Sequence, residues 1–286
     1  MLIFRHATYS IQVNSSCGFD MTKTISPPKD WDRSGLPGWD YFSQELFDLE
    51  CAAIFKTHWQ FVCHVNEVAQ SGAYVTFDIA GERAVVIRGT DGQVRAFHNL
   101  CRHRGSRVVP DARGTCNKAM ICPYHGWAYN LDGSLRGIAN KDTFPPMQAE
   151  KWGLKPLHME IWNGLIFIRF QPGPQPAVAE ILTRFDAEIA PYDLANMIPA
   201  TSNSLADVIP VNWKSIRDVD NEGYHVRQAH PGLHQLYGDG YFAEPVDKGT
   251  SRSVGTFNEA YGHRWSVRKY REILPEATHL PQPQQR

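Results

Sequence analysis

The 286-residue sequence lacks any apolar run long enough to cross a lipid bilayer. Its longest apolar stretches, such as residues 165–168, have the length of a β-strand, whereas a membrane-spanning helix needs about 20 residues. The amino-terminal residues 1–6 also lack the basic and apolar segments of an export signal. We therefore expect a cytoplasmic protein with no membrane partner.

The sequence also lacks an excess of charge of either sign. Lys and Arg number 29, Asp and Glu number 30, and the net charge is -1 with His neutral. A surface that binds nucleic acid or an anionic membrane would need a basic excess, so neither partner is expected. Apolar residues make up 42% and charged residues 21%, which is close to the globular average. The length suggests about two domains.

The coarse pattern along the chain predicts four segments. Residues 1–35 read as a loosely ordered leader and residues 36–57 as an N-terminal helical segment. Short runs rich in Val, Ile, Phe and Tyr then predict an all-β domain over 58–171. Its strands are expected at 74–79, 83–88, 93–99, 127–129, 134–136 and 164–170, with hairpin turns at Asp91-Gly92 and Asp132-Gly133.

A second domain is expected over 172–286, after a Pro-rich boundary. Residues 177–189 and 212–229 have helical patterns, and 201–209 is strand-like. The second helix should end at Ala229 or His230, because Pro231 disfavours the α region at the residue before it.

Six cysteines and twelve histidines stand out in a chain without an export signal. In a reducing cytosol, clustered Cys and His indicate metal or redox chemistry rather than disulfides. One such pair is Cys101 and His103, and the other is Cys122 and His125. One Cys and one His on each loop suits a 2Fe–2S cluster, with two thiolates on one iron and two imidazoles on the other. Zinc is the alternative, although zinc modules usually pair like ligands in each knuckle.

The pattern Cys-x-His followed by Cys-x2-His resembles the Rieske iron–sulfur domain. The resemblance implies four cluster ligands, Cys101, His103, Cys122 and His125. Respiratory Rieske proteins carry an additional Cys in each loop, and these form a disulfide. Ser106 and Tyr124 stand at those positions here, so the sequence is more similar to the oxygenase and ferredoxin branch.

A second group of polar residues lies in the predicted helix 212–229. On a continuous helix, Asp218 and His225 are seven residues apart and nearly eclipsed, and Glu222 lies about 40° from Asp218. His230 lies about 140° from His225, so both reach one ion only if the helix breaks, which Pro231 favours. Two His and a carboxylate from elsewhere would make the facial triad of a non-haem Fe(II) site.

Residues 212–231 resemble the catalytic iron region of the Rieske non-haem iron oxygenases, the aromatic ring-hydroxylating dioxygenase α-subunit family. By position, His225 and His230 match the iron-ligating histidines. Glu222 matches the acidic residue that carries an electron from a cluster His of one subunit to an iron-ligating His of its neighbour. Asp218 matches a polar residue near the iron. The family commonly has Asp at this position, and Glu here resembles family members that oxidise quaternary ammonium or betaine-like substrates.

The resemblance implies an α+β fold: an all-β Rieske 2Fe–2S domain before an incomplete, helix-grip-like catalytic iron domain. It implies an O2-dependent oxidoreductase, a mono- or dioxygenase that hydroxylates or demethylates a small organic substrate. Electrons would come from NAD(P)H through a flavin- or ferredoxin-type reductase and pass from the 2Fe–2S cluster to Fe(II). A complete catalytic domain would form a homotrimer.

The sequence departs from the family at the third iron ligand, an Asp more than a hundred residues beyond the second His. Too few residues follow His230 to supply it, and none of the acidic residues there matches the pattern. We therefore expect a chain truncated at its C-terminus. The alternative functions are an electron-transfer protein with a vestigial, inactive catalytic domain, and a zinc-stabilised binding module.

Overall fold

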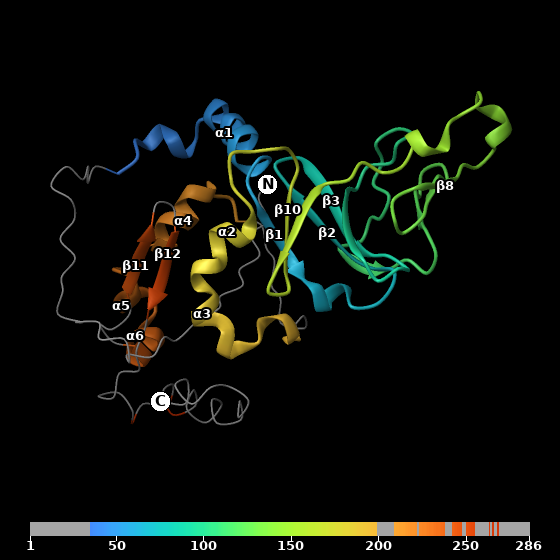
Figure 1. Ribbon diagram of the computed structural model, residues 1–286. Coiled ribbons are helices and arrows are strands. Elements are labelled where there is room, and N and C mark those ends of the chain that lie inside the picture. Colours follow the sequence, from blue (N-terminus) through green and yellow to red (C-terminus); the bar gives the residue numbers. More distant parts are fainter. Residues whose placement is uncertain are drawn as a thin grey trace. The chain divides into compact units, whose positions relative to one another are not determined.

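The computed structural model describes residues 35–198, 209–221, 223–237, 242–247 and 250–254, with residues 263, 265 and 268 (Figure 1). These residues belong to two compact units. The first contains Gln44–Asp186 and residues 193–198, and the second contains residues 35–43, Ala187–Tyr192 and the described residues from Ile209 onward. Most of the predicted leader, residues 1–34, and the expected strand at 201–209, apart from Ile209, lie outside the described residues.

Antiparallel strands make up most of the first unit. The largest sheet has the order β4-β3-β2-β5 and contains β2 (Ala73–Ile79), β3 (Glu82–Arg88), β4 (Val94–His98) and β5 (Arg113–Thr115). A second sheet has the order β1-β10-β9 and contains β1 (Gln60–His64), β9 (His158–Trp162) and β10 (Leu165–Arg169). The third, β6-β7-β8, contains β6 (Met120–Ile121), β7 (Ala128–Tyr129) and β8 (Leu135–Gly137).

Each of the six strands expected from the sequence is present, with ends shifted by about one residue. Four strands of the first unit, β1, β5, β6 and β9, were not expected. β1 does not alternate between buried and exposed residues, and β5 and β6 are too short to show a period. β9 has no fully buried residue to mark an inner face. The mixed α+β fold, with a β-rich domain before a region that contains helices, is confirmed.

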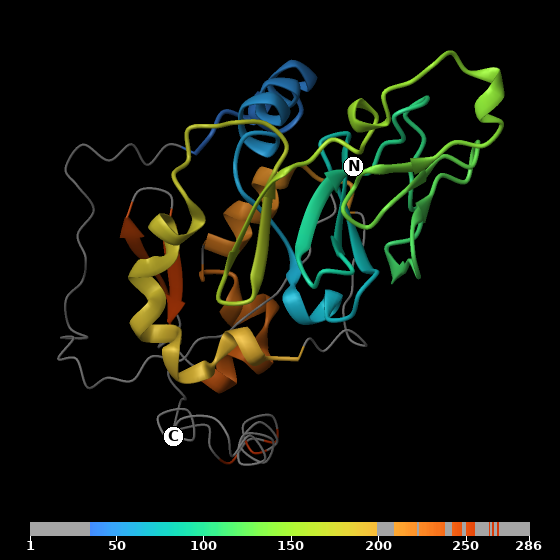
Figure 2. The same ribbon diagram turned by 45° about the vertical axis from the view of Figure 1, so that its right-hand side comes forward.

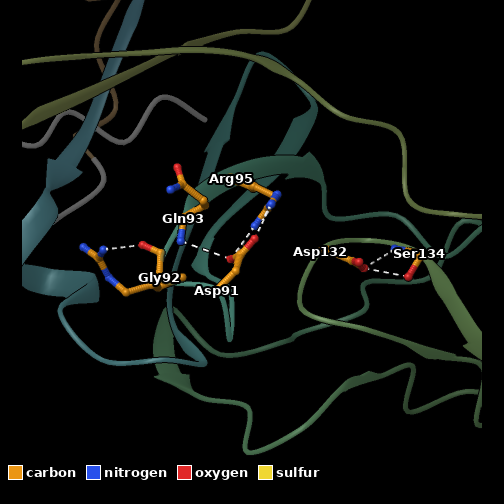
Figure 3. Close-up of polar contacts among 7 residues, drawn as sticks. Asp91, Gly92, Gln93, Arg95, Asp132 and Ser134 are labelled. Atoms are coloured by element: carbon orange, nitrogen blue, oxygen red, sulfur yellow. Dashed lines mark hydrogen bonds and ion pairs between the residues drawn. The ribbon is translucent and has the colours of Figure 1, made fainter.

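Side chains within two hairpins hold their turns closed (Figure 3). In the β3–β4 hairpin, Asp91 accepts a hydrogen bond from the Gln93 backbone N–H and two from Arg95. These bonds, led by those from Arg95, lower the pKa of Asp91 to about 2. In the β7–β8 hairpin, Asp132 accepts from both the backbone N–H and the hydroxyl of Ser134. Both predicted turns are thus confirmed.

The core of the first unit joins two of its sheets. Buried Tyr74, Val85, Ile87 and Phe97 of the four-stranded sheet pack in one cluster with residues of the 100–131 segment. Those residues are Cys101, Val108, Val109, Met120, Cys122, Trp127, Tyr129 and Leu131. Figures 1 and 2 show this segment, in green, extending from the side of β2 and β3. The two predicted Cys–His loops are therefore anchored directly in the hydrophobic core.

Helical segments come before and after these strands in the sequence. The predicted N-terminal helical segment contains α1 (Gln44–Glu50), which continues into a π-helical turn at Cys51–Phe55. The predicted helix at 177–189 consists of α2 (Val178–Leu182), a 3₁₀ turn and α3 (Asp186–Ile189). The Glu160 carboxylate of β9 accepts the Val178 N–H at 2.6 Å, which fixes the start of α2.

The second unit contains α4 (Trp213–Asn221), α5 (Val226–Ala229), α6 (Pro231–Tyr237) and a hairpin of β11 (Phe242–Asp247) and β12 (Thr250–Val254). The single helix expected over 212–229 is wrong, because residues 223–225 are not helical. Gly223 supplies a physical reason, since Gly costs about 1 kcal/mol in a helix interior. The predicted end at Ala229 is confirmed, and His230 leaves the helical region with φ −126° and ψ 63°.

None of the helices in the described part of the chain has the length and apolar character needed to cross a lipid bilayer.

Candidate functional site

The two Cys–His loops share one backbone design. In the first, the Cys101 N–H donates to the Ser106 carbonyl at 2.7 Å, and the Gly105 N–H donates back to the Cys101 carbonyl at 2.9 Å. In the second, the Cys122 N–H donates to the Trp127 carbonyl and the Gly126 N–H to the Cys122 carbonyl, at 2.8 and 3.0 Å. In both loops the Cys N–H bonds to the carbonyl five residues later, and the Gly N–H bonds to the carbonyl four residues earlier. Each Cys is therefore held at the base of a closed loop, with its His near the tip.

One position in each loop has a backbone conformation that favours glycine. Gly105 has φ +70° and Gly126 has φ +69°, which is the left-handed region that side chains rarely adopt. These turns let each loop reverse within a few residues of the Cys.

The loops bring all four predicted cluster ligands together in the first unit. The Cys101 and Cys122 side chains are buried, and the His103 and His125 rings lie 4.6 Å apart between centroids. Burial raises the pKa of the Cys101 thiol, with a smaller contribution from Cys122 beside it. Burial also lowers the pKa of His103, as do His125 and Arg104, which favours the neutral imidazole that ligates a metal.

Three buried nitrogen atoms beside the two loops have no hydrogen-bond partner among the described residues. The described residues contain five buried side-chain N or O atoms without a hydrogen bond, and three of them are Arg102 Nε, His103 Nδ1 and Trp127 Nε1. Buried polar groups normally have partners, and each exception asks for an explanation. An unpartnered ring nitrogen on His103, beside two buried thiols and a second imidazole, fits a bound metal group.

Two residues that the sequence analysis missed support the ligand loops. Asn99 is fully buried, and its side chain donates to the Val109 carbonyl and accepts from the N–H groups of Val108 and Val109. Tyr129 accepts a hydrogen bond from the Arg102 N–H at 2.9 Å, and its hydroxyl lies 3.3 Å from the Cys101 sulfur. No local sequence signal marks either residue, because both act through contacts distant in sequence.

The second predicted group is only partly assembled. His225 and His230 flank α5, and their ring centroids are 5.2 Å apart. The chain leaves the helical conformation before His225 as well as at His230. His225 is therefore not on the same helix as Asp218, and the predicted eclipsed alignment of these two residues is wrong. Asp218 lies on α4 and accepts a hydrogen bond from the Tyr41 hydroxyl at 2.6 Å. Glu222 lies outside the described residues.

In the part of the chain that the structure describes, neither group surrounds a single point with three or more ligands, although each brings Cys or His side chains together in pairs. Within the described residues, no three or more His, Cys, Asp or Glu side chains are arranged to hold one metal ion. A 2Fe–2S cluster with two protein ligands on each iron draws on two such pairs.

Two protein-family models match the chain in succession. The Rieske [2Fe-2S] domain matches residues 58–149, which include both Cys–His loops. The ring hydroxylating alpha subunit (catalytic domain) matches residues 186–286, which include His225 and His230.

Similar proteins include oxygenase subunits that act on quaternary ammonium compounds. The glycine betaine monooxygenase oxygenase subunit of Chromohalobacter salexigens is 34% identical over 79% of this chain and 50% of its own length. The carnitine monooxygenase oxygenase subunit of Escherichia coli is 33% identical over 73% of this chain and 54% of its own. The chain thus spans about half the length of these curated relatives.

A solved structure shows the same relationship. The quaternary ammonium Rieske monooxygenase CntA aligns with a TM-score of 0.68 and 31% identity, covering 77% of this chain and 60% of that one.

Proposed function

The chain belongs to the Rieske non-haem iron oxygenase α-subunit family, and on that basis we propose that it acts as an oxygenase subunit on small quaternary ammonium compounds. The main observation in support is that two buried thiols and two imidazoles lie close together. The Nδ1 atom of one imidazole, His103, is buried without a hydrogen bond. The substrate class is supported by the glycine betaine and carnitine monooxygenase subunits among the relatives.

Cys101, His103, Cys122 and His125 would hold the 2Fe–2S cluster, and His225 and His230 would supply two ligands of the mononuclear Fe(II). When bound, the cluster transfers single electrons and the Fe(II) activates O2 beside the substrate. Glu222 would bridge the two centres across a subunit boundary in a homotrimer. Asp218 would stand near the iron as a polar group.

The protein's own residues define what the cluster site can do. The core residues behind the loops exclude water from the two thiols, which are 4% and 2% exposed. His125 is exposed at the tip of its loop, so the imidazole side of the site faces solvent. An electron donor such as an NAD(P)H-dependent reductase can therefore approach from the histidine side, without opening the core.

The proposed overall reaction inserts one oxygen atom of O2 into a substrate C–H bond and releases the other as water. It uses two electrons and one proton from NAD(P)H and one proton from solvent. The test combines purified protein with a reductase, NADH and either glycine betaine or carnitine, and measures O2 consumption and hydroxylated or demethylated product. Product that depends on all components supports the proposal. A reducible cluster without product would support the electron-transfer alternative, and a colourless zinc protein would support the binding module.

Replacing Tyr129 with Phe should lower the reduction potential of the cluster. The Tyr129 hydroxyl accepts from the Arg102 N–H, so its proton is free to point toward the Cys101 sulfur. That bond stabilises the more negative, reduced cluster. Its loss is worth about 1 kcal/mol, or about 40 mV for one electron, in a redox titration followed by EPR. Tyr74→Phe, in the same core, is the control and should not shift the potential.

Replacing His225 with Ala should remove the mononuclear iron and leave the cluster intact. The two centres use separate residues, so iron content should fall by about one per chain while the cluster EPR signal is unchanged. His234→Ala, on the neighbouring helix α6, is the matched control. Equal iron content in the His225 and His234 variants would show that His225 is no ligand.

A further inference from the structure

Trp127 packs flat against His103, one of the proposed cluster ligands. Its ring is stacked on that of His103 with centroids 5.1 Å apart and an interplanar angle of 2°. Phe144 meets both rings edge-on, each at 5.9 Å, and Trp152 meets Trp127 edge-on at 5.8 Å. These contacts leave the His103 ring little freedom to rotate. Trp127 therefore fixes the plane in which His103 can present its nitrogen.

The indole N–H of Trp127 has no acceptor in the described protein. Trp127 is 2% exposed, and its Nε1 is buried without a hydrogen bond. Tryptophan N–H groups usually find a partner when they are buried. The unpartnered N–H lies in the same stack as the unpartnered Nδ1 of His103. A single group bound beside the stacked rings would give a partner to both of these nitrogen atoms.

We propose that Trp127 is a positioning residue for the cluster: its ring orients His103, and its N–H donates a hydrogen bond to a sulfur atom of the 2Fe–2S group. This inference rests on the proposed cluster ligands Cys101, His103, Cys122 and His125. The sulfur atoms of such a cluster carry negative charge and are the acceptors that the site otherwise lacks. Trp127 thereby acts on electron transfer through the cluster and touches no substrate.

The consequence is a raised reduction potential. A donor to sulfur stabilises the reduced cluster, which carries one more electron than the oxidised cluster. Without the bond, the ratio of reduced to oxidised cluster at a fixed solution potential should fall about five-fold. At 59 mV per tenfold for one electron, that is a shift of about −40 mV.

The sharpest test replaces Trp127 with 3-benzothienylalanine, in which sulfur takes the place of the indole N–H. The ring size and the stacking on His103 are kept, so only the donor is lost. The same replacement at the neighbouring Trp152 is the matched control. Trp127→Phe is a second variant that removes the donor. Redox titrations followed by EPR should show the five-fold change in both Trp127 variants and none in the Trp152 variant.

A second measurement detects the proton itself. Proton ENDOR of the reduced protein in H2O and D2O should show one exchangeable-proton coupling in the wild type that is absent from the benzothienylalanine variant, while the coupling from the Tyr129 hydroxyl is kept in both. An identical set of exchangeable couplings in the wild type and the variant, or equal potentials, would overturn the inference. If the wild type assembles no cluster, the proposed function fails as well. An intact cluster with equal potentials overturns only the role of Trp127.

Discussion

Replacing Cys122 with Ala should abolish the iron–sulfur cluster. The Cys122 side chain is 2% exposed at the base of its loop and faces the same buried site as Cys101. Alanine fits the space of the thiol but cannot ligate iron, so one iron loses half of its protein ligands. Acid-labile sulfide and cluster iron should each fall from about two per chain to near zero, with loss of visible colour, while the separate mononuclear iron is unaffected. Cys101→Ala should have the same effect, and the double variant should be no worse.

Cys116→Ala is the matched control for this prediction. Cys116 is also a free thiol, and it packs against the same core without taking part in either loop. Its removal should leave iron, sulfide and colour unchanged. Equal cluster content in the Cys122 and Cys116 variants would contradict the ligand assignment. Analysis of the purified proteins by metal content and visible absorbance decides between the two results.

Replacing Asn99 with Ala should cause the largest loss of stability in the cluster domain. Asn99 is fully buried, and its amide makes three hydrogen bonds that close the segment carrying Cys101 and His103. Alanine leaves the N–H groups of Val108 and Val109 and the Val109 carbonyl buried without partners. Each such group costs about 1–3 kcal/mol, so a total loss of about 4 kcal/mol is expected.

A loss of that size should lower the thermal midpoint by about 10 °C, measured by circular dichroism on the cluster-loaded protein. Asn130→Ala is the control. The Asn130 amide also bonds within this unit, to the Ser134 hydroxyl, but the bond is exposed to solvent. Its removal should change the midpoint by no more than a degree or two. Similar midpoints for the Asn99 and Asn130 variants would show that the buried amide does not hold the loop.

The two Cys–His loops could be recognised in the sequence because the information for each loop is local. Each Cys–His pair lies on one short loop, and the glycine after each His, Gly105 and Gly126, has the positive φ that the loop requires. The strands 74–79 and 83–88 carried clear runs of β-formers, and the turns carried Asp-Gly signals. Loops, strands and turns of this kind can be predicted from neighbouring residues alone, without knowledge of their tertiary contacts.

Contacts distant in sequence could not be predicted in this way. In the sequence, Asn99, Trp127 and Tyr129 look like ordinary strand and turn residues. Their contacts with other segments are visible only in the structure. The helix over 212–229 failed for a different reason. The helical period continues across Gly223 and so hides the break there, and Pro231 marks only the later break at His230. The roles of the four cluster ligands and of Glu222, Asp218, His225 and His230 remain proposals.

Nitrogen ENDOR of the reduced protein can detect the proposed ligand set, two thiolates and two imidazoles with one of each from each loop. We expect couplings from two imidazole nitrogens. One coupling should be lost when His103 is replaced by Cys, and the other when His125 is replaced by Cys. A reduced cluster without nitrogen coupling, or a protein that binds zinc in place of iron, would contradict this ligand set.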